Sequence, residues 1–381
     1  MLGRILLLFL ILIPVHVEGT IFSNSIHECL EKSDTLITEK KSFDKKLNKT
    51  ENIFLRFIQS FNDIDTTYIE PNYYNYAAML QNTNFYQSYR LRASEGRLGT
   101  QNIIFSPSPN VKVGPYFGWR WIFLGYTFDV SNPHSAGKSS EFNLSLYSSM
   151  IGVDLVYIKN AGNFNIKRIS GFGSILDERI KNVVFNGANT YTASLNLYYV
   201  FNHRKFSYPA AFAQSTVQRK SCGSWMLGFR YDKQRIKFDY TALPSEMVNP
   251  NPETGAPGLL EKMKVNKLDY RNYSVCGGYA YNWVFAKNFL LSVSVAPSIG
   301  FKQAKGERLK GESFWVNVKN LNFDFISRFG LVWNNTKWFA GASFINHLYD
   351  YRRDRFSLTN SVNYFNVYVG LNFHKRKQYR K

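Results

Sequence analysis

Five charged residues lie in segments of the sequence where polar and apolar side chains alternate. They are Arg230, Asp232, Asp239, Asp324 and Arg328. Charges of both signs on one side of extended segments can pair with one another, or they can line a water-filled path and select ions by charge. Asp324 and Arg328 are four residues apart, about 13 Å along an extended chain, so neither can pair with the other. Their role depends on the elements that hold them.

Other residues that could do chemistry lack the rest of their motif. Gly137-Lys138-Ser139 matches the end of a phosphate-binding loop, but Asn132 stands where that loop needs its first glycine. Without this glycine the backbone cannot cradle a phosphate. The acidic stretch at 62–70 lacks the spacing and the turn glycine of a calcium loop. The sequence therefore predicts no cofactor and no metal site.

A hydrolytic serine needs a neighbouring histidine as its base. His347 has Ser343 four residues away, and His134 precedes Ser135 in a polar connection. Chance accounts for both arrangements, so no catalytic residue is assigned. The three cysteines match no metal or redox motif, and a disulfide between Cys222 and Cys276 is not expected.

The elements that carry the five charges alternate with period two from about Tyr76 onward. In the last such segment, apolar residues from Phe365 to Phe373 face one way, and residues such as Tyr368, Gly370 and Asn372 face the other. Ser, Gly, Asn and charged residues recur on one side of these segments and aromatic residues on the other. A secretory signal also precedes them. This combination is typical of a transmembrane β-barrel with a polar interior.

The connections alternate between short and long. The turns at 286–288 and 334–336 are short, whereas 161–188, 241–266, 304–313 and 350–356 are predicted to be longer polar loops. Because outer-membrane barrels have short periplasmic turns, the short turns and the C-terminus are placed in the periplasm. The connection at 203–221 is a longer periplasmic one, in which PAAFAQS forms a helical turn.

These patterns predict an all-β fold, a transmembrane antiparallel up-and-down β-barrel of about 12 strands, within a range of 10 to 14. The predicted strands span about 77–92, 100–107, 109–117, 119–130, 142–160, 189–202, 222–240, 267–284, 289–304, 314–333, 337–349 and 356–373.

Composition agrees with such a barrel. Aromatic residues make up 17% of the 381 residues, which suits two aromatic girdles. The mean hydropathy of −0.28 is too polar for a helical membrane protein. The formal net charge is +20, from 47 Lys and Arg against 27 Asp and Glu. No nucleic-acid-binding module is present, so contact with anionic lipid, including lipopolysaccharide, explains the charge better than a nucleic acid does.

The two ends of the chain differ from the barrel. Residues 1–19 read as a cleaved signal peptide, with Arg4 before an apolar run from Ile5 to Ile13. Residues 20–75 are predicted to be a periplasmic segment that contains a short amphipathic helix at about 44–62. Residues 76–373 form the barrel, and residues 374–381 are predicted to be a loose, basic periplasmic tail.

Several phrases carry a resemblance to a known family. They are DTTYIEPN (65–72), AAMLQNT (77–83), VKVGPYFGWRWIFLGYTFD (111–129), GVDLVY (152–157) and FSYPAAFAQS (206–215). The sequence resembles the family labelled domain of unknown function 4421, a set of Gram-negative outer-membrane barrel proteins, over about residues 60–373. The resemblance implies a barrel in the outer membrane and supplies no catalytic position.

The sequence thus predicts an outer-membrane barrel that is a small-solute pore or a structural or interaction protein of the cell envelope. A lipid-modifying enzyme of the outer membrane, phospholipase-like or acyltransferase-like, is the alternative. The five charges are expected to face the lumen and to pair across it, with a pore lining as the second interpretation. Outer-loop residues Arg352, Arg353 and Arg355 are expected to face outside and to contact phosphates of lipopolysaccharide or another polyanion.

Overall fold

The computed structural model describes residues 64–96, 99–119, 122–125, 128–130, 139–250, 252, 257–304, 321–353 and 355–380. The chain divides into two compact units, Met1–Ser60 and Phe61–Lys381, and all described residues belong to the second. The predicted signal peptide and the predicted amphipathic helix lie outside the described residues. No helix in the described part of the chain is long and apolar enough to cross a membrane.

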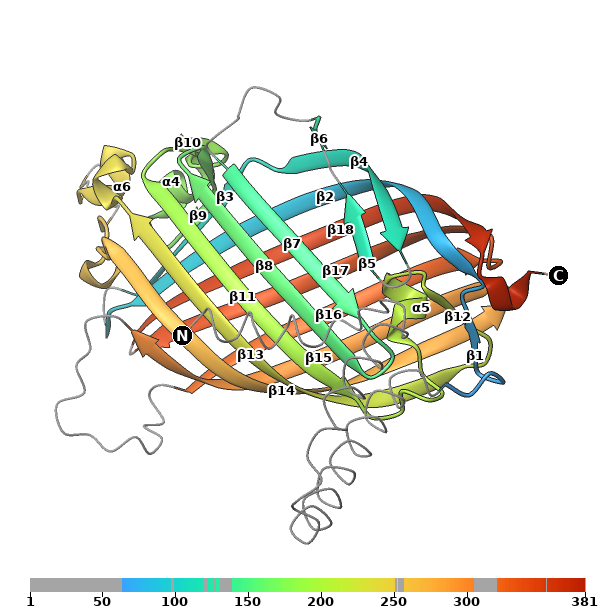
Figure 1. Ribbon diagram of the computed structural model, residues 1–381. Helices are drawn as coiled ribbons and strands as arrows, with labels where there is room; N and C mark the ends of the chain where they lie inside the picture. Colours follow the sequence, from blue (N-terminus) through green and yellow to red (C-terminus); the bar gives the residue numbers. More distant parts are fainter. Residues whose placement is uncertain are drawn as a thin grey trace, which may run out of the picture. The chain divides into compact units, whose positions relative to one another are not determined.

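Most of the described chain forms one large antiparallel sheet (Figure 1). Its strands follow the order β10-β9-β3-β2-β18-β17-β16-β15-β14-β13-β11-β8-β7, with β4 beside β2 and with β5 and β6 beside β4. The all-β antiparallel fold predicted from the sequence is confirmed. The bounds are β2 Tyr74–Ser94, β3 Thr100–Pro107, β4 Asn110–Trp119, β5 Ile122–Gly125, β6 Phe128–Asp129, β7 Ser139–Tyr147, β8 Ile151–Ala161, β9 Phe164–Ser170, β10 Val183–Phe185, β11 Ala188–Val200, β13 Cys222–Phe238, β14 Lys267–Ala286, β15 Phe289–Ala304, β16 Leu321–Asn334, β17 Trp338–Arg353 and β18 Phe356–Lys375.

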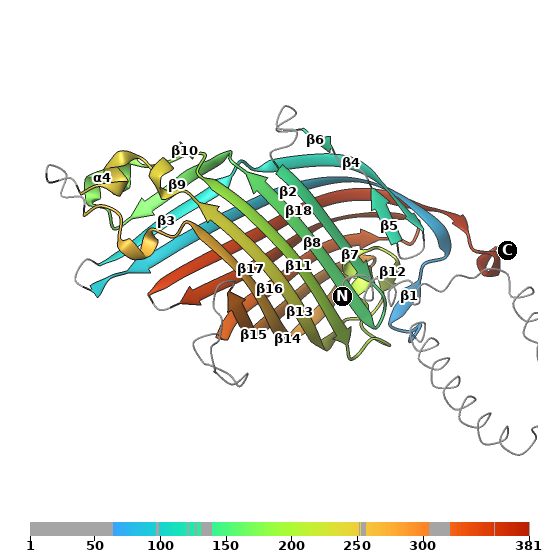
Figure 2. The ribbon, with the colours of Figure 1, turned by 60° about the vertical axis from the view of Figure 1, so that its left-hand side comes forward.

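The sheet curls around an interior, as Figure 2 shows from a second side. Strands far apart in the sheet order therefore meet through their side chains. The Asn160 Nδ2 of β8 donates a hydrogen bond to the Gln87 Oε1 of β2, at 2.9 Å. An ion pair between Lys112 of β4 and Glu141 of β7, at 2.7 Å, links strands near the two ends of the sheet. Between β7 and either β5 or β6, the described residues form no backbone ladder.

Two predicted strands need correction. The segment 142–160 is two strands, because Ser148 turns the chain: its Oγ accepts from the Ile151 N at 2.9 Å. Conversely, β3 and β4 act as one interrupted strand beside β2, since Phe105 faces Tyr89 and Asn110 faces Phe85. Between these two pairs the β3–β4 segment advances five residues and β2 advances four, so the segment contains a one-residue bulge. The bulge lies at the prolines of SPSPN, which have no backbone N–H to donate to a ladder.

The first correction adds one strand and the second removes one, so the predicted number of strands does not change. With β3 and β4 counted together, and β5 and β6 likewise, the predicted strands correspond to twelve positions among the described residues, and the shorter β9 and β10 extend the sheet beside β3. The predicted loop at 350–356 is also mostly strand, because β17 continues to Arg353 and β18 begins at Phe356. The predicted strand 314–333 begins at Leu321, and its first residues lie outside the described part.

The predicted inside–outside register of the last strand is confirmed. The side chain of Val369 is 50% exposed on the outer face, whereas Tyr368 is 7% exposed and faces the interior. Large apolar residues are exposed on the outer face of many strands, for example Trp225 on β13 and Phe323 on β16. The polar face is therefore the buried one, the reverse of a soluble sheet.

Packed segments fill both ends of the interior. At the end of the long connections, α4 (Ser174–Arg179), η2 (Tyr240–Ala242), α6 (Ser245–Val248) and η3 (Glu261–Met263) lie close to one apolar core. Leu176, Met247 and Met263 bring three of these segments into that core, which also includes strand residues from β2 to β18. At the end of the short turns lie α5 (Tyr208–Phe212) and a two-stranded sheet of β1 (Ile69–Pro71) with β12 (Thr216–Gln218).

The described part of the C-terminal tail packs against the start of β2, whereas the sequence predicted a loose tail. After β18 it forms the short helix η5 (Lys377–Tyr379). The Arg376 N donates to the Tyr73 carbonyl at 2.8 Å, and the Tyr379 ring packs edge-on against the Tyr73 ring. Contacts with the start of β2 thus hold the tail at the rim of the sheet.

Candidate functional site

Four of the five charged residues predicted to face the lumen are buried inside the curled sheet. Arg230, Asp232, Asp324 and Arg328 are each at most 4% exposed. Asp239 is the exception and the prediction is wrong for it: β13 ends at Phe238, so Asp239 lies outside the ladder. Its carboxylate accepts hydrogen bonds from the side chain and the backbone of Thr241, which lower the pKa of Asp239.

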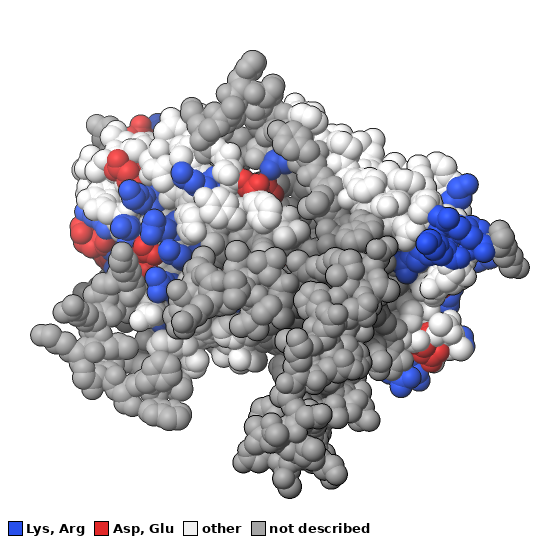
Figure 3. Space-filling view, viewed as in Figure 1, with Lys and Arg blue, Asp and Glu red and all other residues white. Residues whose placement is uncertain are grey.

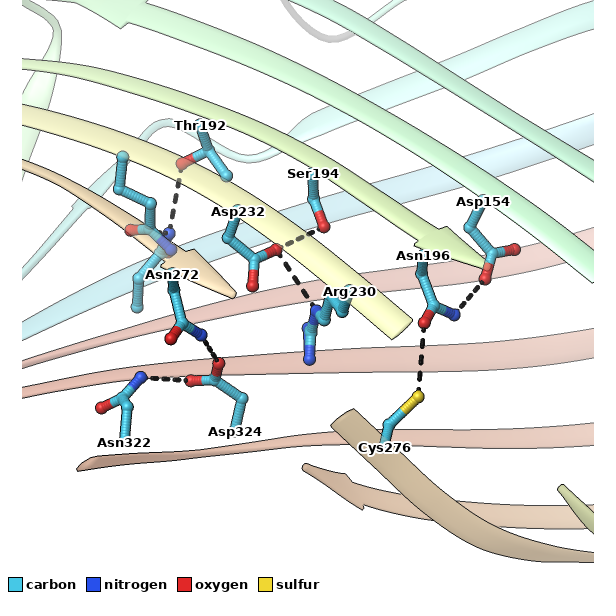
Figure 4. A network of polar contacts seen from close by, with 12 residues as sticks. Asp154, Thr192, Ser194, Asn196, Arg230, Asp232, Asn272, Cys276, Asn322 and Asp324 are labelled. Atoms are coloured by element: carbon cyan, nitrogen blue, oxygen red, sulfur yellow. Dashed lines mark hydrogen bonds and ion pairs between the residues drawn. The ribbon is translucent and has the colours of Figure 1, made fainter. Parts of the chain in front are cut away.

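Arg230 and Asp232 form one buried cluster, drawn in Figure 4. The Arg230 Nε lies 3.2 Å from the Asp232 Oδ1, which also accepts from the Ser194 Oγ at 2.5 Å. The Arg230 guanidinium lies over the Tyr349 ring, 4.8 Å from its centroid. Within the described protein, its Nη1 and Nη2 have no hydrogen-bond partner. This cation is therefore only partly satisfied by its neighbours.

Asp324 is held by neutral donors. It accepts from the Asn272 Nδ2 at 2.5 Å, the Asn322 Nδ2 at 3.0 Å and the Asp350 backbone N at 2.9 Å. The sequence predicted charged partners for Asp324 and Arg328, with Arg230 and Asp232 as candidates. Arg230 and Asp232 instead pair with each other, and Asn side chains replace the expected cation.

Arg328 pairs with a residue that the sequence analysis did not single out, Asp154 of β8. Four strands separate β16 from β8 in the sheet order, so this ion pair joins distant parts of the wall. Asp154 also accepts from the Asn196 Nδ2 and the Ser145 Oγ, both at 2.9 Å. Asp154 lies in the phrase GVDLVY, on the polar face of an alternating segment. This position is the feature of the sequence from which its inward direction could have been predicted.

The α5 segment joins this ion pair. The Tyr208 hydroxyl lies 3.3 Å from the Arg328 Nη1 and donates to the Ser294 Oγ of β15 at 2.8 Å. The Tyr208 ring centroid is 5.8 Å from the guanidinium carbon, and the Tyr198 ring centroid is 5.5 Å from it. One cation is thus surrounded by a carboxylate, a hydroxyl and two aromatic rings.

Local sequence explains why α5 forms a helical turn. Ser207 caps it by accepting from the Ala210 N at 3.2 Å, and Pro209 stands at its start, where no backbone donor is needed. The residues that follow are small or apolar and are buried. Beyond the helix, the Gln214 Nε2 donates to the Tyr368 hydroxyl at 2.9 Å, and its Oε1 accepts from the Asn334 Nδ2 at 3.2 Å.

The predicted helical turn in 203–221 is therefore confirmed, but the segment packs against the inner wall. The helix touches Gly330 of β16 closely: a Cβ at that position would lie 3.3 Å from the Phe212 ring. The connection is thus a plug at the end of the short turns. We refer to residues 206–218 as the inner plug, and to the apolar core around α4, α6 and η3 as the outer core.

His347 and Ser343 do not form a catalytic pair, and His134 and Ser135 lie outside the described residues. His347 is buried, its ring stacks on Tyr349 with centroids 6.1 Å apart, and its Nδ1 has no hydrogen-bond partner in the described protein. Ser343 accepts from the Asn366 Nδ2 at 3.2 Å. Cys222 and Cys276 are free thiols, as expected. The described residues contain no group of three or more His, Cys, Asp or Glu placed to hold a metal ion.

The predicted outer arginines lie at the hairpin that joins β17 and β18. Arg352 is exposed, and its Nε lies 2.5 Å from the Asp350 Oδ2. Arg355 is exposed in the turn, and its carbonyl accepts from the Ser94 N at 2.9 Å. Arg353 lies opposite Phe356 in the ladder. An acidic neighbour therefore partly balances this basic group.

Solved structures similar to this chain include the outer membrane protease OmpT of Escherichia coli, with 7% identity and a TM-score of 0.35 over 78% of this chain and 97% of that one. An outer membrane channel of Pseudomonas putida F1 has 8% identity and a TM-score of 0.29, over 78% and 96%. The translocator domain of the autotransporter NalP of Neisseria meningitidis has 8% identity and a TM-score of 0.27, over 89% and 100%. Comparison with curated proteins gave no match.

A family model covers nearly all of the described fold. The model for a domain of unknown function, DUF4421, matches residues 63–373. This range begins just before β1 and ends within β18, so it includes the wall, the inner plug and the outer core. The chain belongs to the DUF4421 family.

Proposed function

We propose that this protein is an outer-membrane β-barrel with a closed interior, which serves the cell envelope as a structural or interaction protein. Its inside-out polarity supports the location, because exposed residues such as Trp225, Phe323 and Val369 suit contact with lipid chains. The secretory signal predicted at 1–19 supports export. An open solute pore is the competing role.

The observation that carries the proposal is the position of Arg328. It bridges Asp154 on the opposite wall and Tyr208 of the inner plug. A wide porin keeps its inner charges apart in water, so that they act on passing solutes. Here the charges are buried and bound to one another or to amides, which favours a structural role for them.

A second observation supports closure. Amide side chains bridge the middle of the interior: the Asn360 Nδ2 of β18 reaches the Gln234 Oε1 of β13 at 3.3 Å, and the Gln87 Nε2 of β2 donates to the Asn360 Oδ1 at 3.0 Å. Together with the outer core at one end and the inner plug at the other, these bridges support a closed interior.

Conductance across a planar bilayer tests the proposal. The purified full-length protein, inserted into the bilayer, should give no stable conductance steps. Insertion is checked separately by protease protection in vesicles and by the anomalous migration of unboiled barrels on gels. Steady conductance from the inserted wild-type protein would contradict the closed-interior proposal and support a pore. Turnover of phospholipid or lipopolysaccharide acyl chains by the same preparation would favour the enzymatic alternative.

A further inference from the structure

Exposed basic residues gather at the end of the sheet where the short turns lie. We call these residues the basic rim: Arg204, Lys205, Lys220, Lys287, Lys337, Lys375, Lys377 and Arg380. They come from the connection between β11 and β13, from the turns that follow β14 and β16, and from the C-terminal tail. Figure 3 shows part of this cluster beside the C-terminus.

Few acidic residues lie near the rim in the part of the chain that the structure describes. Among the described residues at this end, the carboxylates are Asp65, which accepts from the Thr67 hydroxyl at 2.6 Å, and Glu70, which pairs with Arg219. Lys205 and Lys220 both lie near the Tyr68 ring, at 5.2 and 5.3 Å from its centroid. At the opposite end, by contrast, four of the basic residues form ion pairs with acidic side chains.

The ion pairs at that opposite end show the contrast. Arg179 pairs with Glu246, Arg235 with Asp269, Lys264 with Glu261, and Arg352 with Asp350. The two ends of the barrel therefore carry different charge patterns, one mixed and one basic.

Exposed aromatic residues stand directly beside the basic rim. Trp338 follows Lys337, while Phe285 and Phe373 precede Lys287 and Lys375 by two residues. Outward-facing aromatic residues mark the level of lipid headgroups in membrane barrels. Lysine side chains one or two positions beyond them reach the headgroup phosphates, with their alkyl stems along the apolar surface.

We infer that the basic rim binds the phosphate groups of anionic phospholipids in the membrane leaflet on the side of the short turns. The inference rests on the proposed membrane location. The ordered tail supports it, because contacts of Arg376 and Tyr379 with Tyr73 hold Lys375 and Lys377 at the rim. Attraction to an anionic leaflet increases with each basic residue near its surface.

Binding of phosphatidylglycerol to the protein tests this inference. The full-length protein is purified in a neutral detergent, and its retention of phosphatidylglycerol against phosphatidylethanolamine is followed by native mass spectrometry. The triple variant Lys337→Gln, Lys375→Gln, Lys377→Gln should bind phosphatidylglycerol roughly 100-fold more weakly. The matched control Lys237→Gln, Lys262→Gln, Lys267→Gln removes the same charge from exposed positions at the opposite end and should bind as the wild type does.

The outcomes separate the rim from the membrane location. Equal loss in both triple variants would show attraction by total charge and overturn the inference, as would unchanged binding in the rim variant. Preference of the wild type for isolated peptidoglycan over phosphatidylglycerol vesicles would also overturn it, and would make a cell-wall polymer the partner. Failure of the wild type to insert into bilayers at all would instead contradict the proposed function. The rim variant should still insert and keep its gel migration.

Discussion

At the scale of single residues, the pair of Arg328 and Asp154 fixes how the interior is arranged. The sequence predicts an inward position for Arg328, and the same alternation places Asp154 on a polar side, although Asp154 was not predicted. The sequence does not predict that they meet, because this depends on how far the sheet curls between β8 and β16. The same limit applies to Asp324, whose amide donors come from two different strands. Inward direction is a local property, whereas pairing is set by the whole sheet.

Removing one member of this pair should be costly. Arg328→Ala leaves the buried Asp154 carboxylate without its cation, and the free energy of unfolding should fall by about 3–5 kcal/mol. Asp154→Asn should also destabilise the fold, because Arg328 then keeps an uncompensated charge. The double variant Arg328→Met, Asp154→Leu removes both charges and should recover much of the loss. Urea unfolding in detergent measures all three. Additive losses in the double variant would show that the two residues are not coupled.

At the scale of elements, the outward face of β18 changes character along its length. From Phe365 to Phe373 its outward residues are apolar, whereas Thr359, Ser361 and Asn363 are polar. The apolar part covers nine residues, about 30 Å along the strand, which a tilt of about 35° reduces to roughly the 25 Å height of a barrel's apolar band. The rest of β18 and the adjoining part of β17 therefore extend beyond the membrane. This is why the polar segment at 350–356 was predicted as a loop.

Two arginine substitutions on the same face of β18 test this boundary. Val369→Arg places a charge near the middle of the apolar band and should destabilise the barrel in a bilayer by about 2–4 kcal/mol. Asn363→Arg lies beyond the band, where Asn363 is hydrogen-bonded to Asn346 at 2.6 Å, and should cost no more than about 1 kcal/mol. Unfolding in phospholipid vesicles gives both values. Equal costs would place the membrane boundary elsewhere on the strand.

At the scale of the whole molecule, the sequence predicts much of the wall but little of the inner plug and the outer core that pack inside it. Period-two alternation and turn residues predict the strands, except where Ser148 and the prolines of SPSPN interrupt them. The inner plug was visible as a helical turn, but its inward position was not. A short apolar stretch such as 208–213 packs equally well against an outer rim or an inner wall, and only the curled sheet selects between them.

The positions of the inner plug and the outer core lead to a prediction about ion conductance. If the interior is closed as proposed, the inner plug and the outer core close it at different levels, so they act in series and either one blocks ions. Replacing residues 208–213 with a Gly-Ser linker removes Tyr208 from Arg328 but leaves the outer core, built around residues such as Met247 and Met263. That variant should still conduct little. Shortening the loop at 242–264 alone should also leave the barrel closed, because the inner plug remains. The variant with both changes should conduct, and its ion preference should depend on Arg230 and Asp324, which then face water.

Planar-bilayer recordings of the three variants, each verified as folded by its gel migration, measure these conductances. Full conductance after the first change alone would show that the outer core does not seal the interior, and conductance would then be controlled by the inner plug by itself.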